Sequence, residues 1–411
     1  MSVLSPGLAS LEVYNPPVDI SPLTLSSEVV DLKRSVMRDL LRLAVDPGIT
    51  SLAGGLPAGE LLPTAELRDS IEAVIRRDGA RALQYSPPWE PLREWVSSYM
   101  LARGVACRPE DVFLTNGAQQ GMALLSRLLM DRGQSAVVER VTFTGIQQVT
   151  AGRGARVRLL PTDLKTGADL DALEEALREQ PRPRLVILIP DFHNPLGVSL
   201  SLEKRRRAAA LAAAYGVPLL EDDPYSALRF EGETAPPIKA FDEAGLVFYI
   251  GSFSKMIAPA IRLGWIVTTP DLVARLTVLR ESIDLEASGL MQRAVAAFLQ
   301  AGHLEPHLQR LTAANRARRD ALLSALQREL GDLATWTRPE GGLFVWVTLP
   351  PDIDTWECFQ PALQRKVAYI PGAAFDLAGG SRSTLRLNFS NVAPERIPEA
   401  VKRLAQAFRG E

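Results

Sequence analysis

The chain contains little cysteine and little histidine. Its two cysteines, Cys107 and Cys358, lie far apart and in no metal-type spacing. This argues against a disulfide framework or a zinc cluster and is typical of a protein in a reducing cytosol. Two of the three histidines, His303 and His307, stand at i and i+4 and could supply half a metal site. No third ligand lies near them in sequence, so we interpret them as part of a solvated helix face and predict no metal.

Long hydrophobic runs and an excess of one charge are also missing. The longest apolar runs, such as residues 185–190, are too short to cross a bilayer, and residues 1–24 lack the pattern of a signal peptide. The net charge is −2, so no strong field attracts nucleic acid or an anionic membrane. The basic run at 205–207 has acidic residues close by and is interpreted as a solvated helix face. We expect a soluble, cytoplasmic protein with no nucleic-acid and no membrane partner.

Lysine is scarce among the basic residues, because the chain has 39 arginines and only 7 lysines. Unlike arginine, lysine can lose its proton near neutral pH and act as an amine nucleophile. A lysine in an apolar setting is therefore a candidate for chemistry.

The length of 411 residues exceeds the roughly 250–300 at which a single hydrophobic core stops growing, so we expect two domains. Residues 31–44 show apolar positions at helical spacing, and a turn-forming stretch follows at 51–57. We predict an N-terminal arm and helix over 1–45 that packs with the small domain. A large domain is predicted over 46–290 and a small C-terminal domain over 291–411.

From about residue 60, helical patterns alternate with short runs that are nearly continuously apolar. Such runs predict a mainly parallel sheet with helices on both faces. The predicted fold class is therefore α/β, with a seven-stranded sheet in the large domain. The predicted strands cover 111–115, 135–139, 156–161, 184–190, 217–221, 246–251 and 263–268.

The sequence pattern of the C-terminal third of the chain predicts a smaller α+β domain. Residues 270–330 are mostly helical in pattern and should carry the chain out of the large domain. Strands near 344–349 and 385–389, with a final helix near 394–408, would complete the small domain.

Polar clusters follow four of the predicted strands at their carboxyl ends. Ligands of open α/β sheets bind outside these ends, so the clusters should share one rim. A single cluster of this kind is commonly a turn, but four on one rim indicate a binding site. The clusters are residues 116–120, 191–197, 221–225 and 251–255.

Part of this rim suits a phosphate group. Gly117 precedes a helix whose first N–H groups and dipole favour an anion, although one such glycine is a weak signal. Ser252 and Ser254 add hydroxyl donors, and Arg262 can make a forked contact to phosphate oxygens.

Lys255 completes the set, because it comes directly after a predicted buried strand rather than on an exposed loop. Asp222 ends another buried strand, where a lone carboxylate is costly and a protonated pyridine nitrogen would be a suitable partner. Asn194 and Tyr225 can hydrogen-bond a phenolic oxygen. Together these groups describe an anionic ligand with an aldehyde that an amine holds covalently.

Four segments also carry recognisable motifs in a fixed order. They are 194–197 (Asn-Pro-Leu-Gly), 222–225 (Asp-Asp-Pro-Tyr), 252–265 (Ser-Phe-Ser-Lys-Met-Ile-Ala-Pro-Ala-Ile-Arg-Leu-Gly-Trp) and 386–390 (Arg-Leu-Asn-Phe-Ser). They resemble the Asn-Pro-x-Gly turn, the Asp-x-x-Tyr motif, the lysine signature and the C-terminal arginine motif of class I/II aminotransferases. The resemblance runs from about Val30 to the C-terminus. It implies fold type I and the cofactor pyridoxal 5′-phosphate (PLP).

The resemblance implies a role for each site residue. Lys255 would hold PLP as a Schiff base and Asp222 would keep the ring nitrogen protonated, so both are expected to be catalytic. Arg386 would bind the substrate α-carboxylate, with Asn194 and Gly55 also in the substrate site. The residues expected to contact PLP are Gly117, Ala118, Gln119, Phe143, Asn194, Asp222, Tyr225, Ser252, Ser254, Lys255, Arg262 and Tyr85.

The amino-acid sequences of three segments are most similar to those of the 2-aminoadipate and aromatic aminotransferases. These segments are 51–57, 83–87 and 339–346. In that branch the tyrosine matching Tyr85 reaches the phosphate of the neighbouring subunit, which implies a homodimer with shared active sites. Transcription regulators with a winged helix-turn-helix carry the same type of domain. Only 50 residues precede Ser51, too few for that module and a linker, so we do not expect it here.

Some positions depart from the pattern of the branch. Phe143 stands where tyrosine is common; it should still stack on the pyridine ring but offers no hydroxyl. Val141 stands where proline is common, and Leu196 where threonine is most usual. The segment 88–90, which borders the substrate entrance, is shorter than usual, and Glu286 replaces a neutral residue or histidine.

The expected activity is transfer of an amino group between an α-amino acid and a 2-oxo acid. The alternative is other PLP chemistry in a natural-product pathway, namely decarboxylation, elimination, cyclisation or oxidation, since PLP stabilises any α-carbanion. The altered entrance segment and Glu286 make this alternative credible. A catalytically idle binding or regulatory protein is disfavoured, because no site residue is missing.

Overall fold

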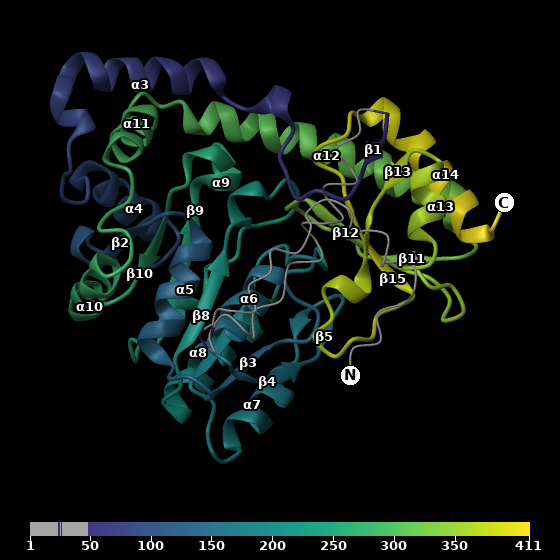
Figure 1. Cartoon of the computed structure of the whole chain (residues 1–411), viewed down its shortest axis with the longest axis horizontal. Helices are drawn as coiled ribbons and strands as arrows, with labels where there is room; N and C mark the ends of the chain where they lie inside the picture. Colours follow the sequence, from purple (N-terminus) through teal and green to yellow (C-terminus); the bar gives the residue numbers. More distant parts are fainter. Residues whose placement is uncertain (1–23, 25, 27–47) are drawn as a thin grey trace.

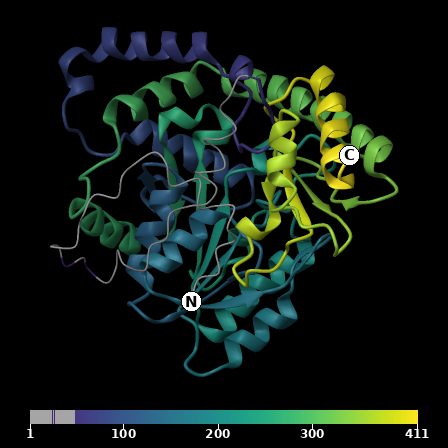
Figure 2. The ribbon, with the colours of Figure 1, turned by 45° about the vertical axis from the view of Figure 1, so that its right-hand side comes forward.

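The computed structural model describes Thr24, Ser26 and residues 48–411. The helix predicted at 31–44 lies outside the described residues. The described chain forms a large domain around one sheet and a small domain beside it, as the two views in Figures 1 and 2 show. This is the predicted fold class.

A seven-stranded sheet with the order β2-β10-β9-β8-β7-β3-β4 forms the centre of the large domain. β10 runs antiparallel to both of its neighbours, and the other neighbouring pairs are parallel. The mainly parallel sheet predicted from the sequence is confirmed. Its strands are β2 (Val112–Thr115), β3 (Ser135–Glu139), β4 (Arg156–Leu160), β7 (Leu185–Leu188), β8 (Leu219–Asp223), β9 (Val247–Ser252) and β10 (Gly264–Val267).

Helices cover both faces of the sheet (Figure 1), which explains why most strands are apolar on both sides. α5, α6 and α10 share one buried cluster with one face, and α4, α7, α8 and α11 pack on the other. β4 lies at the edge, where Arg156 and Leu159 are exposed. The helices are α3 (Thr64–Asp78), α4 (Glu90–Ala102), α5 (Ala118–Leu129), α6 (Thr144–Gly152), α7 (Leu170–Arg178), α8 (Leu202–Tyr215), α9 (Phe253–Met256), α10 (Pro270–Glu281) and α11 (Gly289–Gln300).

The small domain is a four-stranded sheet with helices on it. Its strand order is β11-β12-β15-β14, and β1 pairs in parallel with β13 next to it. Its elements are β1 (Thr50–Ser51), β11 (Thr335–Trp336), β12 (Phe344–Thr348), α13 (Phe359–Gln364), β13 (Val367–Ala368), β14 (Ile370–Pro371), β15 (Thr384–Asn388) and α14 (Ile397–Arg409). A short hairpin of β5 (Thr162–Asp163) and β6 (Gly167–Ala168) extends the large domain.

Helix α12 (Leu304–Leu330) joins the two domains along one side of the molecule (Figure 1). Leu311 in its first half packs with Phe192 and Tyr225 of the large domain, and Leu322 in its second half belongs to the small-domain core. The domain boundaries predicted at 46 and 290 stay predictions.

Two predicted solvated helix faces are partly wrong. His307 is buried, because its side of α12 faces the large domain. In the basic run on α8, Arg205 is also buried, and its ion pair with Asp191 offsets the cost of burying the charge. Helical periodicity turns Arg205 inward and leaves its neighbour Arg206 exposed.

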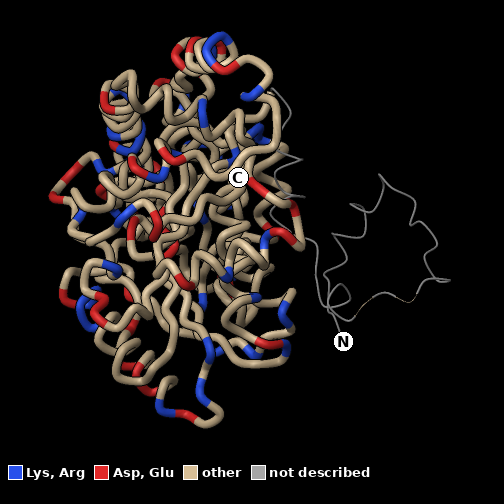
Figure 3. Tube along the Cα trace, turned by 90° about the vertical axis from the view of Figure 1, so that its left-hand side faces the viewer, with Lys and Arg blue, Asp and Glu red and all other residues tan. Residues whose placement is uncertain are grey.

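Acidic and basic residues are interspersed along the described chain (Figure 3). Within residues 48–411, no helix is both long and apolar enough to span a bilayer. The same residues contain no group of three or more His, Cys, Asp or Glu side chains that could hold a metal ion.

Candidate active site

A cavity of about 180 Å³ lies at the carboxyl ends of β7, β8 and β9, at the rim that the sequence predicts. Most of the predicted cofactor residues line it. They are Ala118, Gln119, Phe143, Asn194, Asp222, Tyr225, Ser252, Ser254, Lys255 and Arg262.

One end of this cavity is built for an anion. Gly117 caps the N-terminus of α5, and the guanidinium of Arg262 donates to the carbonyl of Asn116 at 3.0 Å. The guanidinium also reaches the hydroxyl of Ser254 at 3.5 Å. Gly117 has a φ of +84°, and a Cβ added there would come within 2.6 Å of Arg262 Nη2. Glycine is therefore required where the helix start approaches the arginine.

Lys255 lies on the short helix α9, directly after β9. Its Nζ donates to the carbonyl of Gly55 at 2.7 Å, which brings the segment that follows β1 to the cavity. Burial, together with the positive charges of Arg386 and Arg262, lowers the pKa of Lys255 to about 8. The neutral amine, the nucleophilic form, is therefore accessible close to neutral pH.

Asp222 is buried at the end of β8 and faces the same cavity. Burial and the neighbouring charge of Asp223 raise the pKa of Asp222 to about 7. Its Oδ1 makes no hydrogen bond within the described part of the chain. A cofactor with a protonated ring nitrogen fits this atom, because it supplies both a proton donor and an opposite charge.

Asn194, Tyr225 and Arg386 form a connected row between the two domains. Asn194 Nδ2 donates to the Tyr225 hydroxyl at 3.5 Å, and Arg386 Nη1 donates to Asn194 Oδ1 at 2.8 Å. The Arg386 guanidinium lies 4.2 Å from the ring centre of Phe344 and 4.8 Å from that of Phe375. Burial lowers the pKa of Arg386 to about 9, so it stays charged at neutral pH. A carboxylate ligand would offset the cost of burying that charge.

Tyr85 lies apart from this cavity, and its side chain points into solvent with the residue 84% exposed. The adjoining segment, residues 88–90, contacts helix α11 and does not line the cavity. Trp89 N donates to the Gln292 side chain at 2.7 Å, and the Arg293 guanidinium lies 3.8 Å from the Trp89 ring centre.

The structure gives Glu286 a structural contact. Its carboxylate pairs with Arg280, which is buried and also donates to the carbonyl of Leu114. Two positions earlier, Asp284 accepts hydrogen bonds from the side chains of Asn116 and Gln120 at the start of α5. The sequence did not indicate this support of the anion-binding end, because its partners lie far apart in the chain.

A second contact that the sequence did not indicate lies behind Asn194. The imidazole Nε2 of His193 is 3.0 Å from Glu139 Oε2, and both side chains are buried. Glu139 also accepts hydrogen bonds from Ile189 N and the Thr162 hydroxyl. The one available signal was the histidine directly before the Asn-Pro-x-Gly motif.

The family model of aminotransferase class I and II matches residues 54–404. The chain belongs to this family. The resemblance seen in its motifs is thereby confirmed, and so is PLP as the cofactor.

Named relatives agree with this assignment. The chain is 37% identical over 393 residues to aromatic-amino-acid aminotransferase 1 of Thermococcus litoralis, covering 94% of each chain. It is 37% identical over 384 residues to 2-aminoadipate transaminase of Thermus thermophilus, covering 92% of this chain and 95% of that one. A solved kynurenine aminotransferase of Pyrococcus horikoshii superposes with a TM-score of 0.90 at 34% identity, covering 95% and 98% of the two chains.

The aminotransferase is also similar to an HTH-type transcriptional regulator of Bacillus subtilis. That match is 32% identical over 361 residues and covers 86% of this chain but 73% of the regulator. The similarity is compatible with the predicted relationship to regulators that carry the same type of domain.

Replacing Gly117 by Ala should weaken PLP binding by at least about tenfold, because the backbone region is strained for other residues by about 1–3 kcal/mol. The added methyl group would also displace Arg262. Spectrophotometric titration of the apoprotein with PLP measures this. The control is Gly216→Ala, which has a φ of +64° but open space around the Cβ position. Equal PLP affinities of the two variants would contradict the role of Gly117.

The rate at which PLP reacts with the apoprotein should increase with pH and reach half of its maximum near pH 8. The reason is that the pKa of Lys255 is lowered to about 8, so the neutral amine predominates above that pH. Stopped-flow absorbance over a pH series tests this. A half-maximum close to the pKa of an ordinary lysine, about 10.4, would contradict it.

Proposed function

We propose that this aminotransferase moves an amino group between an α-amino acid and a 2-oxo acid, with Lys255 and Asp222 as its catalytic residues. The observation that carries the proposal is their placement. Asp222 is buried and Lys255 is half-buried, and both border one cavity that also contains an anion-binding end and adjoins a buried arginine, Arg386.

When bound in this cavity, PLP would supply an electron-accepting ring that stabilises negative charge at the α-carbon of the amino acid. Gly117, Ser254 and Arg262 would hold its phosphate. Asp222 would accept a hydrogen bond from the ring N–H and keep that nitrogen protonated.

The substrate is oriented by the row of side chains between the domains. Arg386 binds the α-carboxylate through its guanidinium, with Asn194 hydrogen-bonded beside it. Asn194 and Tyr225 would hydrogen-bond the phenolic oxygen of the bound ring. Lys255 would move the proton of the substrate α-carbon through its neutral amine.

The alternative PLP reactions lose both features of the sequence that favoured them. Glu286 pairs with Arg280 and residues 88–90 pack on α11, so neither contributes a reactive group to the described cavity. Amino-group transfer remains the function that the site supports best.

Lys255→Ala should abolish the absorbance band of covalently bound PLP and lower the transfer rate by at least about 10³-fold, because it removes both the anchor and the proton carrier. Lys402→Ala, at an exposed position on α14, is the matched control. The assay measures 2-oxo acid and pyridoxamine phosphate with L-2-aminoadipate and the aromatic amino acids as donors. Release of carbon dioxide or peroxide instead would overturn the assignment.

We further propose that two copies of the chain share their active sites. Apolar side chains that a second copy could cover lie close to the exposed Tyr85, and a Cβ at Gly289 would lie 2.8 Å from the Ser86 hydroxyl, so the two segments are neighbours. The exposed residues are Leu83, Tyr85, Ile283 and Leu285. A second copy seated here would receive the Tyr85 hydroxyl at its own phosphate.

Leu83→Glu should shift the protein from dimer to single chains and reduce activity in parallel, because it places a charge in the proposed contact. Sedimentation velocity and the transfer assay measure the two effects. Leu202→Glu, at a comparably apolar exposed position on α8, should change neither. A wild-type protein that is active as a single chain would contradict the proposal.

A further inference from the structure

The Arg386 guanidinium is held by two phenyl rings and by hydrogen bonds to Asn194 Oδ1 and the carbonyl of Ala53. It lies between Phe344 and Phe375, at 4.2 Å and 4.8 Å from their ring centres. Phe344 begins β12, and Phe375 follows the turn after β14. Both rings are buried, so a shift of either segment would move the guanidinium with it.

The segment that carries Phe344 is fastened to the large domain by Glu340. The carboxylate of Glu340 accepts a hydrogen bond from Arg229 Nη1 at 2.6 Å. Its backbone carbonyl accepts from Phe230 N at 3.0 Å and Glu231 N at 3.1 Å. We call the Arg229–Glu340 ion pair the first latch.

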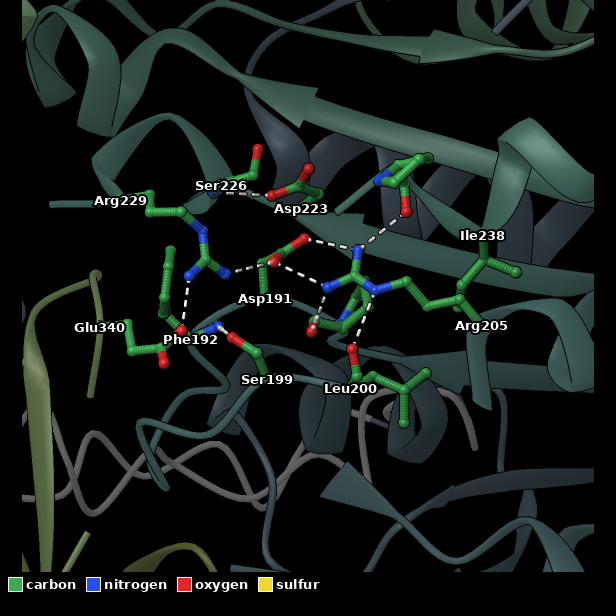
Figure 4. Close-up of polar contacts among 12 residues, drawn as sticks. Asp191, Phe192, Ser199, Leu200, Arg205, Asp223, Ser226, Arg229, Ile238 and Glu340 are labelled. Atoms are coloured by element: carbon green, nitrogen blue, oxygen red, sulfur yellow. Dashed lines mark hydrogen bonds and ion pairs between the residues drawn. The ribbon is translucent and has the colours of Figure 1, made fainter. Parts of the chain in front are cut away.

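The large-domain end of the first latch, Arg229, lies beside the segment that carries Asn194. Figure 4 shows Arg229 beside Asp191, at 3.8 Å, and Asp191 held by Arg205. The Arg205–Asp191 pair is bidentate, at 2.8 and 2.9 Å, and fully buried. Asp191 precedes Asn194 by three residues, so the first latch joins a wall of the cofactor site to a wall of the Arg386 site.

The segment that carries Phe375 is fastened in a comparable way on the other side. Asp376 receives two hydrogen bonds from Arg140, at 3.0 and 3.1 Å. The backbones pair as well, since Thr142 N donates to Phe375 O and Leu377 N donates to Arg140 O, each at 3.0 Å. We call the Arg140–Asp376 ion pair the second latch. Its large-domain end lies three residues before Phe143, which lines the cofactor cavity.

We propose that the two latches set the position of Arg386 relative to the cofactor, which makes Arg140 and Glu340 positioning residues for the substrate carboxylate. The proposal rests on the proposed function, in which Arg386 binds that carboxylate. Both latches cross from the large domain to the small domain, and each ends beside one of the two rings that enclose the guanidinium. Loosening a latch therefore weakens carboxylate binding and leaves the proton transfer at Lys255 intact.

The test uses Arg140→Gln and Glu340→Gln in the full-length holoenzyme. These two side chains are the more exposed partners, at 48% and 54%, so their replacement preserves the buried packing. We expect KM for the best amino acid donor of the panel to rise by about tenfold, within the range of up to about 10²-fold that a misplaced group can cost. We expect kcat and the absorbance band of bound PLP to stay unchanged.

Arg409→Gln is the matched control. It breaks the Arg409–Asp332 ion pair of 2.9 Å, which lies inside the small domain and touches neither ring. KM should stay at the wild-type value in this variant. The conservative variants Arg140→Lys and Glu340→Asp, which keep the charges, should recover part of the lost affinity.

A double-mutant cycle separates positioning through Arg386 from a general structural effect. In an Arg386→Lys background, Arg140→Gln should have little further effect on kcat/KM, because the positioned group is already gone. Additive effects would overturn the proposal, as would unchanged KM in both latch variants or a loss of bound PLP. An unchanged KM in Arg386→Lys would contradict the proposed role of Arg386 in binding the carboxylate. A raised KM in Arg386→Lys with an unchanged KM in both latch variants would contradict only the positioning role of the latches.

Discussion

The buried carboxylate of Asp222 is the constraint on which the rest of the site depends. It lies at the end of β8, where burial and the charge of Asp223 raise its pKa to about 7. The Arg103 guanidinium, 2.9 Å from Asp223, lowers the pKa of Asp223 and so favours a negative charge beside Asp222. The carboxylates of Asp222 and Asp223 thus make one end of the cavity electrically negative. A cationic group on the ligand would stabilise these buried charges.

The opposite ends of the cavity are positive. Arg262 and the start of α5 lie at one end, and Arg386 lies on the small-domain side. These same charges contribute to lowering the pKa of Lys255 to about 8, after burial. One arrangement of charges therefore orients an elongated ligand and activates the amine that reacts with it, without a separate base for the lysine.

The sequence predicts the seven strands and the polar rim well, because parallel strands must present their carboxyl ends along one edge. It could not predict which of three consecutive arginines on α8 points inward, because residues 208–214 are all Ala or Leu and do not indicate which side of the helix is buried. It also could not assign Glu286 to Arg280 or Asp284 to Asn116. Those pairs depend on how the α10–α11 connection folds back on the sheet. The enclosure of Arg386 by two rings likewise joins segments that no local pattern connects.

The antiparallel placement of β10 has a consequence for how the chain can vary. Ser252 at the end of β9 pairs with Gly264 at the start of β10, so Lys255 and Arg262 both belong to the single connection between two adjacent strands. Its two ends are fixed by the sheet. An inserted or deleted residue there would move the covalent anchor and the phosphate anchor relative to each other. Surface connections of this protein should therefore tolerate changes in length. A change in length of the β9–β10 connection should abolish activity, whatever residues are inserted.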